Sequence, residues 1–234
     1  VEQAFYRASL ANVFVAASAG NSGPANAVAH ISPWLTTVAA STHDRNFLAN
    51  VLLGNGGSYS GASTNTATVT AKPLIRAEDA ALGAGNASLC YSAGAPAGQA
   101  LLDPAKVAGK IVVCTRGENA RVDKSLAVLN AGGVGMILVD GPADTGPVGD
   151  IHSVPTVHLK AADATPVKAY AATAGATASI SPFTNQSKPA PVMAGFSSRG
   201  PNMGDANILK PDLTAPGVDV IASVTPALTP AQRD

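Results

Sequence analysis

A continuous run of apolar residues near the start of the sequence restricts the fold more than any other feature. Residues 2–11 have helical periodicity, and Asn12 follows them as a suitable C-terminal cap. Residues 13–17 come next as an unbroken apolar run, which is typical of a parallel strand covered on both faces. A helix that leads directly into such a strand predicts an α/β fold.

The same character returns in other parts of the sequence. Residues 35–40 form a second apolar run, after which the chain becomes polar and rich in glycine. Near the other end, residues 192–196 and 218–223 again have the pattern of buried strands. We therefore expect the two outer segments, 1–70 and 184–234, to belong to one structural unit.

The middle of the chain, residues 71–183, has a different pattern. Short runs rich in β-branched residues alternate with turns, at 111–113, 134–139 and 154–159. An amphipathic helix is predicted over 118–131, where apolar residues recur at i, i+4 and i+7, at Val122, Leu126 and Leu129. A stretch rich in Ser, Thr, Asn and Pro at 181–191 has the composition of a linker. These features predict an inserted β-rich domain with a few helices.

Composition excludes several classes of partner. With 46% hydrophobic and 13% charged residues, the chain can bury a core and is not expected to be disordered. Fifteen basic residues offset fifteen acidic ones and no stretch concentrates one sign, so we expect neither nucleic acid nor an anionic membrane as a partner. The longest apolar runs have the length of strands, and a bilayer span would need about 20 residues.

The two cysteines and four histidines bear on cross-links and metals. Cys90 and Cys114 flank a stretch with turn-forming Gly and Pro, which suits a disulfide worth about 3 kcal/mol, with two buried free thiols as the alternative. The histidines are scattered, and no Cys/His/Asp cluster has ligand spacing, so we expect no metal. The glycine-rich runs at 54–57 and 83–85 complete no nucleotide-binding motif, so we expect hairpin turns and no cofactor.

The string at residues 16–24 is the part of the sequence best suited to chemistry. It lies where an expected buried strand gives way to a loop, and sites in α/β sheets are built at the carboxyl ends of strands. The Asn21 amide, between glycines that permit close approach of a backbone, could donate a hydrogen bond to a developing oxyanion. By itself, however, an asparagine flanked by glycines is typical of a turn.

Three strings in order extend this interpretation. Residues 18–24 resemble the oxyanion-hole segment of the subtilisin-like serine proteases, and residues 33–45 resemble the strand that follows it. Residues 196–218 are similar to the segment that precedes the nucleophile in that family. Between them, Cys90 and residues 102–135 resemble a protease-associated domain. The resemblance implies a partial subtilisin-like parallel sheet, formed by the two flanking segments, with an inserted β-rich protease-associated domain.

The resemblance also implies roles for individual residues. Asn21 would be the oxyanion donor, and one wall of the pocket for the residue before the scissile bond would be formed by Ala17, Ser18, Ala19 and Gly20. In subtilisin itself, loss of the matching asparagine lowers turnover by about 10²- to 10³-fold. The secreted family also favours a disulfide between Cys90 and Cys114.

The catalytic triad of this family is not expected within the sequence. Its Asp and His come before the oxyanion segment, and its Ser lies in a Gly-Thr-Ser motif, which does not occur here. Ser197 or Ser198 could be considered as a nucleophile beside His152 or His158. In the match to the family, however, both serines belong to a structural strand and turn. We therefore expect this chain alone to have no peptidase activity.

Some members of the family bind calcium near positions that match residues 36–40 and Asp212. Lys210 lies two residues before Asp212 and could supply a positive charge internally. We therefore expect no required calcium.

Two functions of different class follow. The first is a secreted serine endopeptidase that cuts polypeptides through an acyl-enzyme, with the inserted domain modulating substrate access or protein contacts. A propeptide or self-association would provide further contacts. The second is a non-catalytic protein-binding module, because protease-associated domains also occur in sorting receptors and unrelated peptidases. The outer strings at 18–24 and 196–217 favour the protease.

Overall fold

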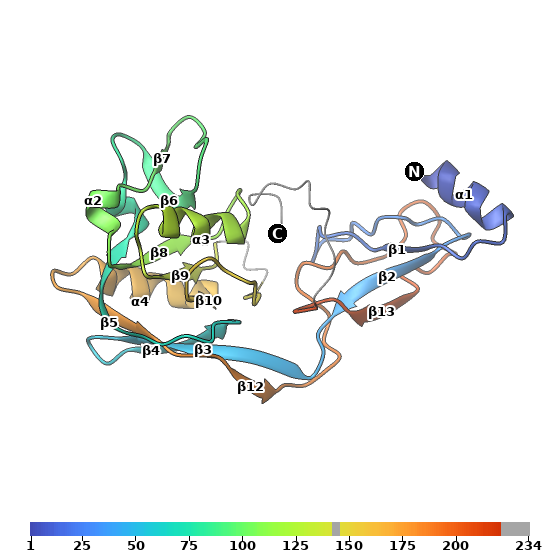
Figure 1. Cartoon of the computed structure of the whole chain (residues 1–234). Helices are drawn as coiled ribbons and strands as arrows, with labels where there is room; N and C mark the ends of the chain where they lie inside the picture. The colour runs from blue at the N-terminus through green and yellow to red at the C-terminus, as the bar shows by residue number, and fades with distance from the viewer. Residues whose placement is uncertain (142–145, 221–234) are drawn as a thin grey trace. The chain divides into compact units, whose positions relative to one another are not determined.

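The computed structural model describes residues 1–141 and 146–220 (Figure 1). The chain forms two compact units, of which the first contains Val1–Arg45 and residues 187–220 and the second contains Asn46–Gln186. The change in residue pattern along the sequence predicts the first domain boundary at residue 70 instead. The boundary of the structure falls earlier because the strands directly after Arg45 pair with strands of the second unit.

In the first unit, helix α1 (Glu2–Leu10) confirms the predicted helix. Asn12 follows with φ of 58°, a left-handed conformation that asparagine tolerates better than most residues. Strands β1 (Ala16–Ser18), β2 (Thr36–Ser41) and β13 (Leu213–Pro216) form a parallel sheet in the order β1-β2-β13. Residues from the two ends of the chain therefore share one sheet.

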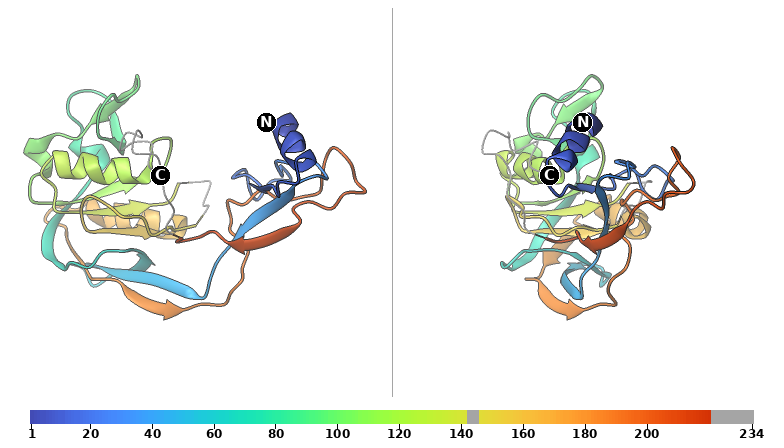
Figure 2. Two further views of the ribbon diagram at one scale, coloured as in Figure 1. Left: turned by 45° about the vertical axis from the view of Figure 1, so that its right-hand side comes forward. Right: turned by 90° about the vertical axis from the view of Figure 1, so that its right-hand side faces the viewer.

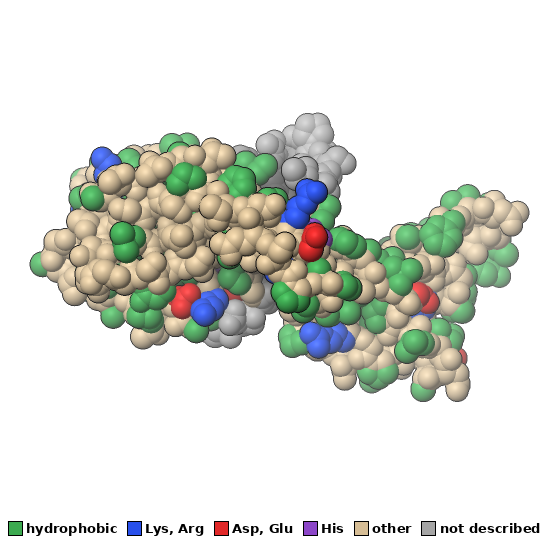
Figure 3. All heavy atoms as spheres, turned by 90° about the horizontal axis from the view of Figure 1, so that it is seen from below, with side chains coloured by type: hydrophobic (Ala, Val, Ile, Leu, Met, Phe, Trp, Pro, Cys, Tyr) green, Lys and Arg blue, Asp and Glu red, His purple; other side chains and the backbone are tan. Residues whose placement is uncertain are grey.

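The prediction that residues 13–17 are covered on both faces is wrong for this chain. Val13 is 55% exposed and Phe14 is 79% exposed, and β1 begins only at Ala16. The described part of the first unit supplies α1 and three short strands, which are too little to cover both faces of a sheet. Figure 3 shows a face of the molecule on which hydrophobic side chains reach the surface and charged side chains are few.

The predicted strand at 192–196 is also wrong. Here the chain makes only an isolated bridge between Met193 and Ser41, and Val192 N donates to the side chain of Thr42. Residues 218–220 lie outside any strand, and residues 221–223 lie outside the described residues. The strand that joins this part of the chain to β2 is β13, which comes earlier in the sequence than 218–223.

The main sheet of the second unit closes on itself. Its strands pair in the order β11-β5-β8-β9-β10-β4-β3-β12, and a further pairing joins β11 to β3. These strands are β3 (Arg45–Leu53), β4 (Ser58–Ala62), β5 (Val69–Arg76), β8 (Ile111–Thr115), β9 (Gly135–Val139), β10 (Thr156–Leu159), β11 (Thr177–Ile180) and β12 (Thr184–Ser187). The glycine-rich residues 54–57 form the turn of the β3–β4 hairpin, as expected.

Strands β8 and β9 separate two buried clusters. Ile111 and Val113 face a cluster that includes Val167 of helix α4 (Ala161–Ala171). Val112 and Cys114 face the other cluster, which includes Val128 of helix α3 (Arg121–Asn130). Because successive strand residues point to opposite faces, α3 and α4 cover opposite sides of these strands (Figure 2).

Smaller elements extend the second cluster. They are the 3-10 helix η1 (Ala77–Ala80), the paired strands β6 (Asn86–Tyr91) and β7 (Gln99–Leu101), and helix α2 (Pro104–Val107). A disulfide between Cys90 and Cys114 joins β6 to β8, with an S–S distance of 2.01 Å and a Cα–Cα distance of 6.0 Å. The predicted cross-link is therefore confirmed.

Helix α3 buries a different face from the one that its apolar pattern predicts. Leu129 is 49% exposed, whereas Asp123 and Lys124 are 2% and 0% exposed. Lys124 Nζ donates to Leu89 O at 2.8 Å and to Asn119 Oδ1. Asp123 accepts hydrogen bonds from Ser92 and Asn119, so the buried polar groups of this face are paired.

Candidate functional site

The loop after β1 carries the residues that the sequence selects. Ala17 and Ser18 lie in β1, Ala19 follows with 1% exposure, and Gly20 leads to Asn21. The Asn21 side chain is exposed and has no hydrogen bond to another described residue. The structure thus places a free side-chain amide at the carboxyl end of a parallel strand, directly beside the four residues expected to form a pocket wall.

A segment from the far end of the chain fastens this loop. Ser198 N donates to Gly20 O at 2.9 Å, and Gly23 N donates to Phe196 O at 2.8 Å. Ser22 N donates to the side-chain oxygen of Ser198, also at 2.9 Å. Ser198 is 1% exposed, so the anchoring residue itself is buried, and its contacts hold the half-exposed loop in place.

The two glycines of the loop are required by the close approach of this segment. Gly20 has φ of +93°, and a Cβ added to it would lie 3.0 Å from Ser198 Oγ. A Cβ at Gly23 would lie 2.2 Å from Ser197 O and 2.7 Å from Gly195 O. The sequence suggests that these glycines admit another backbone. In the structure, backbone of the same chain occupies that space at Gly23, whereas the side chain of Ser198 occupies it at Gly20.

The two serines of the far segment have different partners. Ser198 Oγ accepts from the loop, whereas Ser197 Oγ accepts from Ala40 N in β2 at 3.0 Å. Both serines are 1% exposed. Among the described residues, neither hydroxyl bonds to a histidine, and His152 and His158 bond to groups of the second unit instead.

A buried lysine lies beside the first strands. Lys210 is 2% exposed, and its Nζ donates to Leu35 O at 2.8 Å and to Asp212 Oδ2 at 2.6 Å. Burial alone would raise the pKa of the Asp212 carboxyl, but hydrogen bonds from Lys210 and Thr37 N hold that pKa below its ordinary value. The ammonium thus lies among carbonyl and carboxylate oxygens, the ligand type that calcium prefers. Within residues 1–141 and 146–220, no group of three or more His, Cys, Asp or Glu could hold a metal.

Comparison with known proteins identifies both parts of the chain. The PA domain family matches residues 69–167. The chain is 42% identical over 231 residues to subtilisin-like protease SBT1.6 of Arabidopsis thaliana, covering 96% of the chain and 29% of that protein. It is 44% identical over 237 residues to subtilisin-like protease SBT5.3 of Arabidopsis thaliana, covering 97% of the chain and 30% of that protein. The chain is a subtilase-family segment with an inserted PA domain.

The subtilase segment thus spans less than a third of the length of these curated relatives. Among solved structures it is similar to the psychrophilic subtilisin-like protease Apa1 from Pseudoalteromonas sp. AS-11, with a TM-score of 0.39 and 18% identity, covering 84% of this chain and 51% of that one. Over the described residues, no helix is long and apolar enough to cross a membrane.

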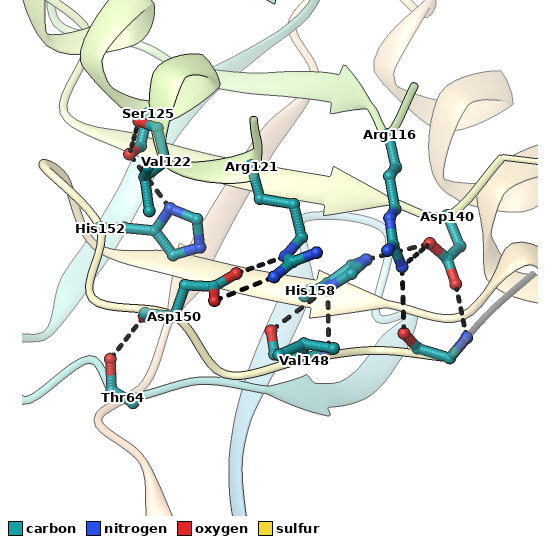
Figure 4. Close-up of polar contacts among 11 residues, drawn as sticks. Thr64, Arg116, Arg121, Val122, Ser125, Asp140, Val148, Asp150, His152 and His158 are labelled. Carbon is teal, nitrogen blue, oxygen red and sulfur yellow. Dashed lines mark hydrogen bonds and ion pairs between the residues drawn. The ribbon is translucent and has the colours of Figure 1, made fainter. Parts of the chain in front are cut away.

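Sequence reasoning missed a polar cluster in the PA domain of the subtilase segment (Figure 4). Asp140 Oδ1 lies 3.3 Å from Arg116 Nη1 and 3.2 Å from His158 Nε2, and Asp150 Oδ2 lies 2.5 Å from Arg121 Nε. Burial would raise the pKa of Asp140, but His158 and Arg116 lower it. The partners are 18 to 29 residues apart, so no local motif indicates them.

His152 lies at the edge of this cluster. Ser125 Oγ donates to Val122 O at 2.8 Å and lies 3.0 Å from His152 Nδ1. Because the serine hydrogen is already used, Nδ1 of the neutral imidazole carries the proton of that contact. Nε2 is then a buried acceptor without a hydrogen-bond partner among the described residues. Burial lowers the pKa of His152 to about 4.

Proposed function

We propose that this segment belongs to a secreted serine endopeptidase that hydrolyses polypeptides through an acyl-enzyme, and that Asn21 stabilises the oxyanion. The observation that carries the proposal is the free Asn21 amide at the carboxyl end of β1, on a loop anchored by the buried residue Ser198. The names of SBT1.6 and SBT5.3 support the same reaction class.

In this mechanism Asn21 acts only when negative charge develops. Attack on the scissile carbonyl moves charge onto its oxygen, and a donor already fixed in place stabilises that charge without reorganisation. The backbone and small side chains of Ala17–Gly20 form the adjoining wall of the pocket. The nucleophile and its base are contributed by parts of the parent protein outside this chain.

The PA domain, in this proposal, modulates access of the polypeptide substrate or contacts with other proteins, such as a propeptide or a second copy. Secretion is supported by the Cys90–Cys114 disulfide, because such bonds form and persist in oxidising compartments. An alternative is a non-catalytic binding module, which the PA match at residues 69–167 favours for the chain taken alone.

Substitution of Asn21 in the full-length parent tests the proposal. We expect Asn21→Ala to lower kcat on a peptide substrate by about 10²- to 10³-fold, with a small change in KM, because the lost hydrogen bond forms only in the transition state. Asn26→Ala is the matched control, because Asn26 is an exposed asparagine of the same loop. It should leave kcat unchanged.

A fluorophosphonate probe separates the two functions. The parent should be labelled at its nucleophile, whereas residues 1–234 alone should remain unlabelled. A parent that is neither labelled nor able to cleave peptides would support the binding module. Labelling of the isolated chain at Ser197 or Ser198 would contradict the assigned location of the nucleophile.

A further inference from the structure

Ser198 contacts the residues on both sides of Asn21. Its N–H donates to the carbonyl of Gly20 at 2.9 Å, and its side-chain oxygen accepts from the N–H of Ser22 at 2.9 Å. Gly20 directly precedes Asn21 and Ser22 directly follows it. One buried residue therefore fixes both peptide groups that flank Asn21.

We propose that Ser198 is a positioning residue for the oxyanion donor: its hydroxyl holds Ser22 so that the Asn21 amide points to the reacting oxygen. This inference rests on the proposed function of Asn21. It assigns to Ser198 no contact with substrate and no step of proton transfer.

The need for such a residue follows from the exposure of Asn21. Its side chain has no hydrogen bond to another described residue, so only the backbone sets the direction of the amide. An oxyanion donor is effective when it is held within about 0.5 Å of the productive geometry. A displacement of about 1 Å can cost 10²-fold in rate.

The Ser198 hydroxyl is itself well fixed. The residue is 1% exposed, and the place that a Cβ of Gly20 would take lies 3.0 Å from Ser198 Oγ. A larger residue at position 20 would therefore displace the hydroxyl. The positive φ of Gly20 and the short contact together restrict this position to glycine.

The rest of the loop has independent support. Gly23 N donates to Phe196 O at 2.8 Å, and Arg199 N donates to Ala25 O at 3.1 Å. Both contacts join backbone groups and do not depend on the side chain at 198. Substitution of Ser198 by alanine should therefore leave the loop folded and release only the peptide group of Ser22.

Ser197 provides a matched control. It is the adjacent residue, has the same side chain and the same 1% exposure, and accepts one hydrogen bond from a backbone N–H. That donor is Ala40 N of β2, however, and not a group of the Asn21 loop. The two alanine variants thus lose the same kind of bond at different places.

The test compares five forms of the full-length parent: wild type, Asn21→Ala, Ser198→Ala, Ser197→Ala and the double variant Asn21→Ala/Ser198→Ala. We expect Ser198→Ala to lower kcat by about 10-fold or more with KM within about twofold, because the misplaced donor acts in the transition state. Ser197→Ala should lower the urea midpoint by about as much as Ser198→Ala does, because both lose the same kind of bond. It should leave kcat within about twofold of the wild-type value. The double variant should have the kcat of Asn21→Ala, because Ser198 acts through Asn21.

Ser198→Cys covers the case in which Ser198→Ala does not fold. Its side chain is close in size, but sulfur is a weak acceptor, so we expect the same loss of kcat. Unchanged kcat in the folded Ser198 variants would overturn the proposal. The proposal would also be overturned if the double variant lost kcat by the product of the two single fold-losses. If Asn21→Ala alone leaves kcat unchanged, the proposed function of Asn21 fails. The Asn21→Ala variant therefore distinguishes failure of the Asn21 proposal from failure of the Ser198 proposal.

Discussion

Asn21 and His152 each have a polar group without a hydrogen-bond partner among the described residues. The Asn21 amide is exposed, so water can satisfy it, and in the proposed function a substrate oxygen takes the place of that water. His152 Nε2 is buried, and a proton there would place a charge where no acceptor is available. The lack of a partner therefore leaves the exposed Asn21 amide to water, whereas it makes the buried ring of His152 resist protonation.

The buried imidazole makes stability depend on pH. His152 has a folded-state pKa of about 4, below the value of 6.5 expected for an unfolded chain. Between these values the unfolded state binds more protons, so acid favours unfolding. We expect the urea midpoint to fall as the pH is lowered from 6.5 to 4, with no further contribution from His152 below that range.

Comparison with His152→Gln isolates this contribution, because carboxyl groups also titrate in acid. The variant should lose less stability than wild type between pH 6.5 and 4. Equal slopes for wild type and His152→Gln would contradict the prediction.

At the scale of elements, helix α3 and the disulfide act on the same part of the PA domain. Lys124 of α3 donates to Leu89 O, and Asn119 Nδ2 lies 3.3 Å from Cys90 O. Strand β6 is thus held to its neighbours by polar contacts as well as by the bond to Cys114. The disulfide closes a separation of 24 residues, which restricts the unfolded chain.

Removal of the disulfide should lower the free energy of unfolding. We expect Cys90→Ala/Cys114→Ala to lose about 3 kcal/mol in urea titrations of residues 1–234, chiefly because the unfolded chain gains freedom. Reduction of the wild type should have a similar effect and should leave the double variant unchanged. A double variant as stable as the oxidised wild type would contradict this expectation.

Features that depend on neighbouring residues were predictable from the sequence. Helix α1, the run that becomes β2 and the pairing of Cys90 with Cys114 all follow from local periodicity or from family resemblance. The buried face of α3 was not predictable, because Lys124 is satisfied by groups at least five residues away in sequence. Hydrophobic spacing alone counts such a residue as exposed.

Local sequence patterns also could not predict the exposure of side chains or the contacts between distant residues. The apolar residues Val13 and Phe14 indicate burial, but burial depends on what else packs against them. Around Asn21, the motif indicated the amide and the glycines. The contact between Ser22 and Ser198 spans 176 positions and depends on how the two outer segments meet.

At the scale of the whole molecule, the chain leaves the first unit after Arg45 and returns to it at residue 187. All members of both large buried clusters lie between Ala49 and Ile180. The PA-containing unit therefore has its own core, whereas the described part of the first unit has a small sheet with exposed apolar residues.

Limited proteolysis should reveal this difference. With a protease of broad specificity, we expect a resistant product close to residues 46–186, because its backbone is protected by the two cores. Mass spectrometry of the product identifies its ends. Early cleavage within residues 110–140, which contain β8, α3 and β9, would contradict the expectation.

The attachment of the Asn21 loop to Ser198 has a consequence for biosynthesis. The ribosome releases Asn21 before Ser198, and Ser198, the partner of Ser22, emerges only after the whole PA domain has been translated. Domains generally fold as units during translation, so the PA domain can complete its core before Ser198 is available to bind the Asn21 loop. In the proposed function, the oxyanion donor is therefore set in place late in synthesis, and the order of the chain itself disfavours premature proteolysis.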